Sequence, residues 1–131
     1  MGYRFTESNG NGRELVYISD NELSPAALYD VPEDWRPQFV EFVRGASVFV
    51  HDTMYTIDEY EYHRGWGHST YHDALDVAIE AEVETLVLFH HKPERSDDEL
   101  DKRVDECRKL AKSRGSRLEI IAAAEGLTLT V

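Results

Sequence analysis

Two short apolar runs, each followed directly by histidine, constrain the fold of this chain most strongly. Residues 46–50 read Ala-Ser-Val-Phe-Val and precede His51-Asp52, and residues 85–89 read Thr-Leu-Val-Leu-Phe and precede His90-His91. Nearly continuous apolar strands of this kind are typical of α/β proteins, where helices bury the sheet. We therefore expect an α/β fold with polar side chains gathered where the strands end.

The chain before these runs indicates a hairpin and a polar loop. Strand-like residues 3–5 and 14–18 flank a segment rich in glycine and asparagine, which is a hairpin signal. The second strand ends at Ser19-Asp20. Residues 21–30 then form a polar loop, which we expect Leu23 and residues 26–28 to hold against the fold.

Three helices and two closing strands complete the expected fold. Asp34 can cap a helix whose apolar side chains recur at helical spacing up to Gly45. Thr70 with Asp73, and Ser96 with Glu99, form capping-box patterns ahead of two further helices. We expect residues 118–123 and 127–131 to be strands.

Size and charge limit the classes of function. A chain of 131 residues fits one domain, residues 1–131, and Cys107 is its only cysteine, so we expect a buried, unpaired thiol. No apolar run is long enough to cross a membrane and the start does not resemble a signal peptide, so we expect a cytoplasmic protein without a membrane partner. The net charge of -12 and the scattered basic residues lead us to expect no nucleic-acid partner.

Histidine and carboxylate side chains at the strand ends indicate a metal-dependent hydrolytic site. Asp20, His51-Asp52 and His90-His91 all lie at such ends, and this ligand chemistry suits zinc, manganese or iron. His68 closes a glycine-rich loop just before a helix, where backbone N–H groups favour an anion such as phosphate.

Each of these side chains also has a purely structural interpretation. A histidine at a strand end is more often a hydrogen-bonded surface residue than a metal ligand, and His63 and His72 have weaker claims still. Because neighbouring residues of a strand point to opposite faces, only one of His51 and Asp52 can face a given site. Trp66, in the glycine-rich loop, is as suited to packing that loop as to contacting a substrate.

Three ordered motifs resemble those of metallo-β-lactamase-fold hydrolases, in the branch with ribonuclease Z and cyclic phosphodiesterases. The motifs are HDTMY from His51, GWGHST from Gly65 and LVLFHHKP from Leu86. By this resemblance the chain is the carboxyl-terminal half of an αββα sandwich, a mixed sheet with helices on one face. The resemblance assigns Asp52 as a metal-bridging ligand, His90 as a metal ligand and His68 as the residue that contacts the scissile phosphate.

The family's main metal-binding signature, His-x-His-x-Asp-His, is absent from the sequence. The resemblance therefore implies a two-metal, phosphodiesterase-like site that is completed by another half or a second polypeptide, and a chain that is inactive alone. An exposed apolar sheet face would favour a homo-oligomer. The expected substrate is a small phosphoester, an RNA-processing enzyme being disfavoured by the charge. The alternative is a non-catalytic interaction or sensor domain that keeps the fold.

Overall fold

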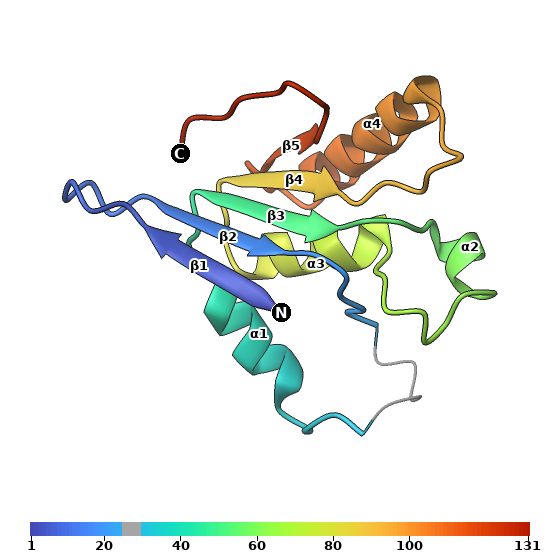
Figure 1. Cartoon of the computed structure of the whole chain (residues 1–131), viewed down its shortest axis with the longest axis horizontal. Coiled ribbons are helices and arrows are strands. Elements are labelled where there is room, and N and C mark those ends of the chain that lie inside the picture. The colour runs from blue at the N-terminus through green and yellow to red at the C-terminus, as the bar shows by residue number, and fades with distance from the viewer. Residues whose placement is uncertain (25–29) are drawn as a thin grey trace.

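A five-stranded mixed sheet forms the centre of the computed structural model, which describes residues 1–24 and 30–131 (Figure 1). The strand order is β1-β2-β3-β4-β5; β1 pairs antiparallel with β2, and the other neighbours pair in parallel. The strands are β1 (Gly2–Thr6), β2 (Glu14–Ile18), β3 (Val48–Asp52), β4 (Thr85–Phe89) and β5 (Glu119–Ala122). The expected α/β fold with a mixed sheet is confirmed.

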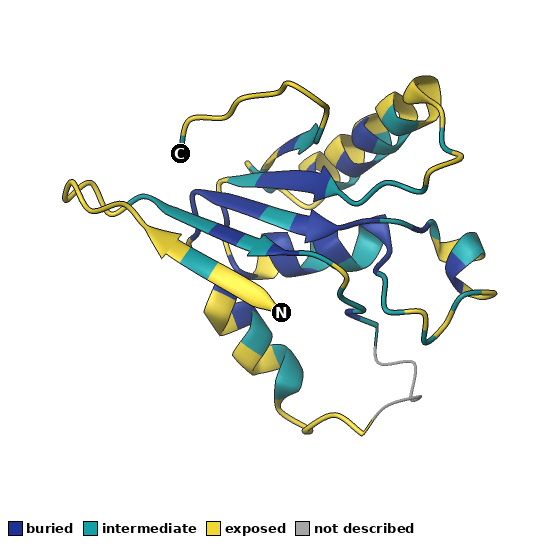
Figure 2. Ribbon diagram, viewed as in Figure 1, coloured by how far each residue is buried: buried dark blue, intermediate teal, exposed yellow. Residues whose placement is uncertain are grey.

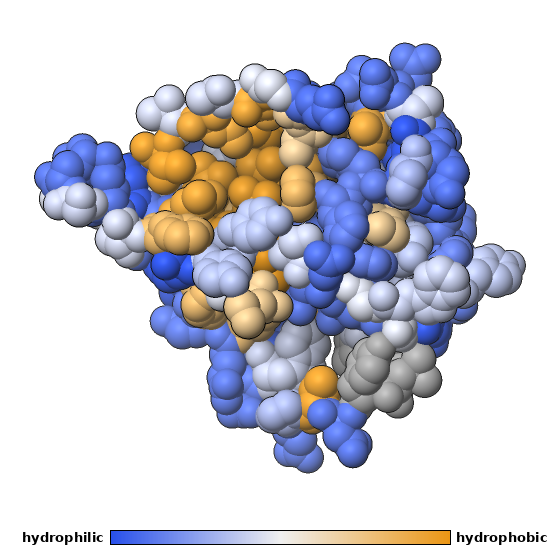
Figure 3. Space-filling view, in the orientation of Figure 1, coloured by the Kyte–Doolittle hydropathy of each residue, from blue (hydrophilic) through white to orange (hydrophobic). Residues whose placement is uncertain are grey.

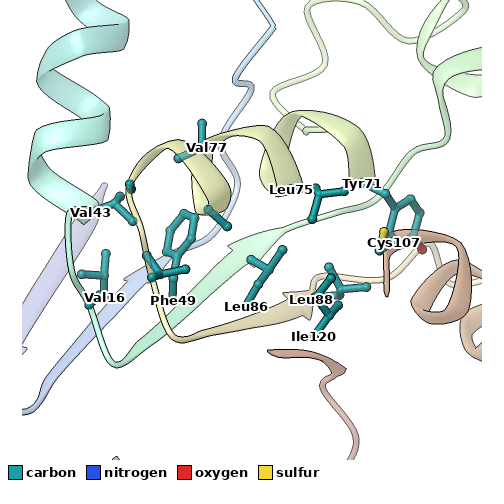
Figure 4. Packing of buried hydrophobic residues seen from close by; sticks show 14 of the residues in the cluster. Val16, Val43, Phe49, Tyr71, Leu75, Val77, Leu86, Leu88, Cys107 and Ile120 are labelled. Carbon is teal, nitrogen blue, oxygen red and sulfur yellow. The ribbon is translucent and has the colours of Figure 1, made fainter. Parts of the chain in front are cut away.

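Three of the helices cover one face of this sheet and share an apolar core with its strands, whereas the short second helix lies beyond the strand ends (Figure 1). The helices are α1 (Trp35–Val43), the short α2 (Ile57–Tyr60), α3 (Tyr71–Glu80) and α4 (Asp97–Ser113). Phe49 and Leu86 point from the central strands into a buried cluster with α3, and Ile120 joins it from β5 (Figure 4). Cys107 lies in the same core on α4, buried and unpaired as expected.

The opposite face of the sheet has no helix over it in the described part of the chain, and its apolar side chains are visible as a patch (Figures 1 and 3). On β1, Tyr3 and Phe5 are 48% and 55% exposed. Toward the middle of the sheet the side chains are partly covered, and Tyr17 packs against Phe89 with 5.6 Å between ring centroids. We call this the open sheet face. The residues of the central strands β3 and β4 are more buried than those of β1 (Figure 2).

Capping interactions place the helices as the sequence predicts, with one exception. Ser96 and Glu99 form a complete capping box at α4, and the Thr70 hydroxyl accepts from the Asp73 N–H at α3. Asp34 precedes α1 but makes no side-chain cap hydrogen bond, because its carboxylate accepts from the Gln38 side chain instead.

Strand β3 ends in His51-Asp52, as the sequence predicts, and pairs with β4 up to the Asp52–Phe89 register. Helix α2 is not predicted from the sequence, and two further expectations need correction or lie outside the structure. Residues 127–131 form no strand, because they pair with no other strand among the described residues. The loop contacts expected of residues 26–28 lie outside the described part of the chain.

Candidate active site

Four side chains from four separate elements meet beyond the carboxyl ends of the parallel strands. Asp20 follows β2, Asp52 ends β3, His90 follows β4, and His68 lies three residues before the first residue of α3. One potential ligand atom from each lies within 4.8 Å of the others. The parallel registers of β2, β3 and β4 align these strand ends, which is why residues far apart in sequence converge here.

Asp52 is the buried centre of this group. Its Oδ2 lies 2.7 Å from His68 Nδ1 and 3.1 Å from His90 Nδ1, while its Oδ1 accepts from the Met54 and Ser69 N–H groups at 3.2 and 3.3 Å. The side chain is fully buried. A carboxylate offers about four lone-pair positions, and three hydrogen bonds and the close His90 ring occupy the surroundings of this one.

The contact with Asp52 also fixes the state of the His68 ring. A carboxylate only accepts hydrogen bonds, so His68 Nδ1 carries a proton and the neutral ring has Nε2 as its acceptor. His68 is mostly buried, with 17% of its side chain exposed. It packs edge-on against His90 at 4.8 Å between ring centroids.

His90 and Asp20 form the exposed side of the group. His90 Nδ1 lies 3.3 Å from Asp20 Oδ1, and the Asp20 side chain is 70% exposed. Both residues have a left-handed backbone, with φ of 57° at His90 and 49° at Asp20. Such conformations cost about 1–3 kcal/mol and are concentrated at functional sites, where surrounding contacts hold them.

His51 lies on the other face of β3, as the alternation of a strand requires. Its ring is fully buried against Phe39 and Phe49, and Nδ1 donates to the Asp52 carbonyl oxygen at 2.8 Å. Burial lowers the pKa of His51 to about 4, although that hydrogen bond opposes the shift. His51 is therefore a neutral core residue behind the site.

The glycine-rich loop that carries His68 is fastened by the segment that follows Asp20. The Glu22 carboxylate accepts from the Gly65 and Gly67 N–H groups at 2.8 and 3.0 Å and from the Tyr60 hydroxyl. Ser69 Oγ donates to the Asn21 carbonyl at 2.6 Å and accepts from the Leu23 N–H at 3.0 Å. One stretch of chain thus supplies Asp20 and also positions the loop of His68.

The remaining histidines lie outside this group. His91 Nε2 donates to the Ala123 carbonyl at 3.1 Å, and burial lowers the pKa of its ring. His63 stacks on Tyr55 with 4.7 Å between ring centroids. His72 lies in the first turn of α3.

Sequence reasoning identified Asp20 as a strand-end carboxylate without assigning it to the site, and it missed Glu22 altogether. The signal for Asp20 resembles that for His90, because both are polar residues within two positions of the end of an apolar strand. No local pattern marks Glu22, because its partners Tyr60, Gly65 and Gly67 are separated from it by 38 to 45 residues.

The fold belongs to a known class, the metallo-β-lactamase fold. Human tRNase Z, short form, aligns with 98% of this chain at a TM-score of 0.63 and 17% identity, and the chain covers 37% of it. The metallo-β-lactamase fold protein YhfI from Bacillus subtilis aligns with 88% of the chain at a TM-score of 0.59 and 21% identity, 39% of its own length being covered. This chain therefore has part of the metallo-β-lactamase fold.

The sequence relatives are more specific, since they are ribonucleases Z. That of Brevibacillus brevis is 33% identical over 69% of this chain, and that of Methanopyrus kandleri is 34% identical over 77%. The chain spans 24% and 32% of the length of these relatives. No protein-family model matches the sequence.

These relatives overturn one expectation from the sequence. We expected no nucleic-acid partner and disfavoured an RNA-processing enzyme, but the relatives are ribonucleases. The inference failed because net charge is a sum over a surface, whereas a phosphate is bound by the few groups next to it.

No helix in the described part of the chain is long and apolar enough to span a membrane.

Proposed function

We propose that this chain supplies part of the active site of a metal-dependent phosphodiesterase that cleaves RNA. The observation that carries the proposal is the convergence of Asp20, Asp52, His68 and His90 within 4.8 Å at the strand ends. The similarity to ribonuclease Z, over 69% of the chain in the Brevibacillus brevis protein, supports the choice of substrate class.

Asp20 and His90 are the residues of this chain most available to a metal. Asp20 is largely exposed, and among the described residues its recorded polar contacts are with the neighbouring Ser19 hydroxyl and with His90. A carboxylate and an imidazole fit zinc, manganese or iron. When bound, such a metal supplies a Lewis acid that draws electron density from a phosphoryl group.

Asp52, which the family resemblance assigns to the metal, has a second role that its contacts support. Its oxygens already accept from the His68 ring and from two backbone N–H groups, and His90 Nδ1 lies 3.1 Å from Oδ2, so a metal reaches Asp52 only if His90 turns its ring away. We assign to Asp52 the task of holding the His68 ring with its proton on Nδ1.

His68 then acts at the substrate as an acid. With Nδ1 bound to Asp52, its Nε2 is the atom that can carry a second proton and give it to the leaving oxygen of a phosphodiester. The buried Asp52 carboxylate stabilises the positive ring that precedes this transfer. General acid catalysis of this kind contributes about 10²–10⁴-fold in rate.

The site is incomplete within this chain. Asp20 and His90 give two ligands, whereas a zinc site takes about four. The other ligands come, in our proposal, from a segment with the His-x-His-x-Asp-His signature that lies against the open sheet face. The apolar patch on that face equally favours the alternative, a non-catalytic interaction domain, so metal binding must separate the two (Figure 3).

Calorimetric titration of the purified chain with Zn²⁺ or Mn²⁺ tests the proposal. Asp20→Asn and His90→Ala should each weaken the affinity for metal about tenfold or more, as loss of a ligand or of its partner does in metal sites. His72→Ala, which removes a histidine outside the group, should leave the affinity unchanged. Equal affinities in all four proteins would refute the metal role and favour the interaction domain.

A further inference from the structure

We propose that Trp66 is a stacking platform for a base of single-stranded RNA next to the candidate active site. This inference rests on the proposed function and names how its substrate is held. Trp66 lies in the glycine-rich loop, two residues before His68, and 65% of it is exposed to solvent. Because most of the Trp66 indole is exposed to solvent and does not pack in the core, it is available to contact a ligand.

A series of aromatic contacts connects this exposed ring to the site. Trp66 packs edge-on against His63, with 4.8 Å between ring centroids, and His63 stacks on the buried Tyr55 at 4.7 Å. Tyr55 in turn meets the edge of His68 at 6.0 Å. Trp66 is thus the outer end of a packed series of rings whose inner end is the proposed acid.

The backbone around Trp66 is fixed before any ligand arrives. The Trp66 N–H donates to the His63 carbonyl at 3.1 Å, and the Glu22 carboxylate holds the N–H groups of both flanking glycines. Those glycines, Gly65 and Gly67, have φ of 81° and 86°, which side chains other than glycine rarely adopt. A platform that is already ordered loses little entropy when it binds.

Stacking also suits the charge of the surroundings. The arginines near the loop are engaged in ion pairs, Arg64 with Glu61 and Arg95 with Glu59. Attraction to phosphates therefore contributes little here, whereas every base offers an aromatic face to an indole. The chemistry of this surface selects the base of a nucleotide and not its phosphate.

Tyr62 provides a matched comparison on the same loop. It is 84% exposed, more than Trp66, but none of the aromatic contacts in the described part of the chain involves it. If exposure alone made an aromatic residue bind RNA, Tyr62 would bind as well as Trp66. The proposal predicts that only the ring packed toward the site does so.

The test is an NMR titration of the ¹⁵N-labelled chain, in EDTA, with hexaadenylate. The chain has two tryptophans, so Trp35 on α1 serves as an internal reference for the Trp66 indole N–H signal. We expect a saturable shift of the Trp66 signal alone. Trp66→Ala should weaken binding about fivefold or more, Trp66→Phe should retain most of it, and Tyr62→Ala should leave it unchanged.

A hexamer of the same phosphates without bases should not shift the Trp66 signal. Equal binding of this abasic hexamer, an equal loss in Tyr62→Ala, or unchanged binding in Trp66→Ala would each overturn the proposal. Because the titration contains no metal, its result does not depend on metal binding by Asp20 and His90. A failed metal site and a failed stacking platform therefore give different results.

Discussion

At the scale of single residues, the alternation of strand β3 divides two adjacent polar side chains between core and site. His51 points into the helix-covered face and Asp52 into the group with His68 and His90. The alternation itself could be predicted from the sequence. The sequence could not predict whether His51 or Asp52 points toward the site, because that depends on which face of the sheet the helices cover.

The buried His51 makes the stability of the chain depend on pH. Its pKa is about 4 in the folded chain against an ordinary value of 6.5, so the unfolded chain binds a proton that the folded chain excludes. The contribution to stability is complete above pH 6.5 and is lost as pH falls toward 4. The shift corresponds to about 3 kcal/mol of unfolding free energy.

Urea unfolding of the metal-free chain between pH 7 and pH 4 measures this loss. His51→Asn, which cannot titrate, should lose less stability than the unmodified chain over the same range, by about 3 kcal/mol. Identical pH profiles of the two proteins would show that His51 takes up its proton without unfolding the core.

At the scale of elements, local signals predicted the helices better than the loops. The Ser96 and Glu99 box begins α4 as predicted, and the Thr56 and Glu59 pair that caps α2 has the same pattern but was overlooked. Residues 127–131 have an alternating apolar pattern without a strand, because a strand also needs a neighbour. Contacts such as Glu22 to Gly67 are non-local, and no local pattern encodes them.

The hydrogen bonds that Glu22 accepts from the Gly67 N–H and the Tyr60 hydroxyl should stabilise the glycine-rich loop. Glu22→Ala leaves the Gly67 N–H and the Tyr60 hydroxyl without this acceptor, which should cost about 1–3 kcal/mol of stability. Hydrogen exchange at the Gly67 amide should accelerate. The control is Glu61→Ala, whose exposed ion pair with Arg64 should contribute at most about 1 kcal/mol. Similar exchange rates of the Gly67 amide in both variants would argue against this role of Glu22.

At the scale of the whole molecule, the sheet face that no described helix covers lies next to the candidate site, which we propose to be incomplete. The helices bury one face (Figure 1), and the strand registers with the Tyr17–Phe89 contact put Tyr17, Asp52 and Phe89 on the open sheet face. A segment that covered this face would thus also lie beside the site. The homo-oligomer expected from the sequence stays a prediction, as do the cytoplasmic location and the identity of the metal.

The chain alone should have little or no phosphodiesterase activity. Two metal ligands are too few to hold a metal in a catalytic geometry. With Zn²⁺ or Mn²⁺, the purified chain should hydrolyse bis-p-nitrophenyl phosphate no faster than the metal solution does without protein. Turnover that disappears in His90→Ala would mean that the chain, or an assembly of its copies, completes the site unaided.

The central claim, that the strand-end group and not the acidic surface receives the metal, is tested most directly by paramagnetic broadening. Mn²⁺ added in small amounts to the ¹⁵N-labelled chain should first broaden the amide signals of Asp20, Ser69 and His90, and this selectivity should disappear in Asp20→Asn. Broadening that begins instead along the acidic start of α4, at Asp97, Asp98 and Asp101, would contradict the account.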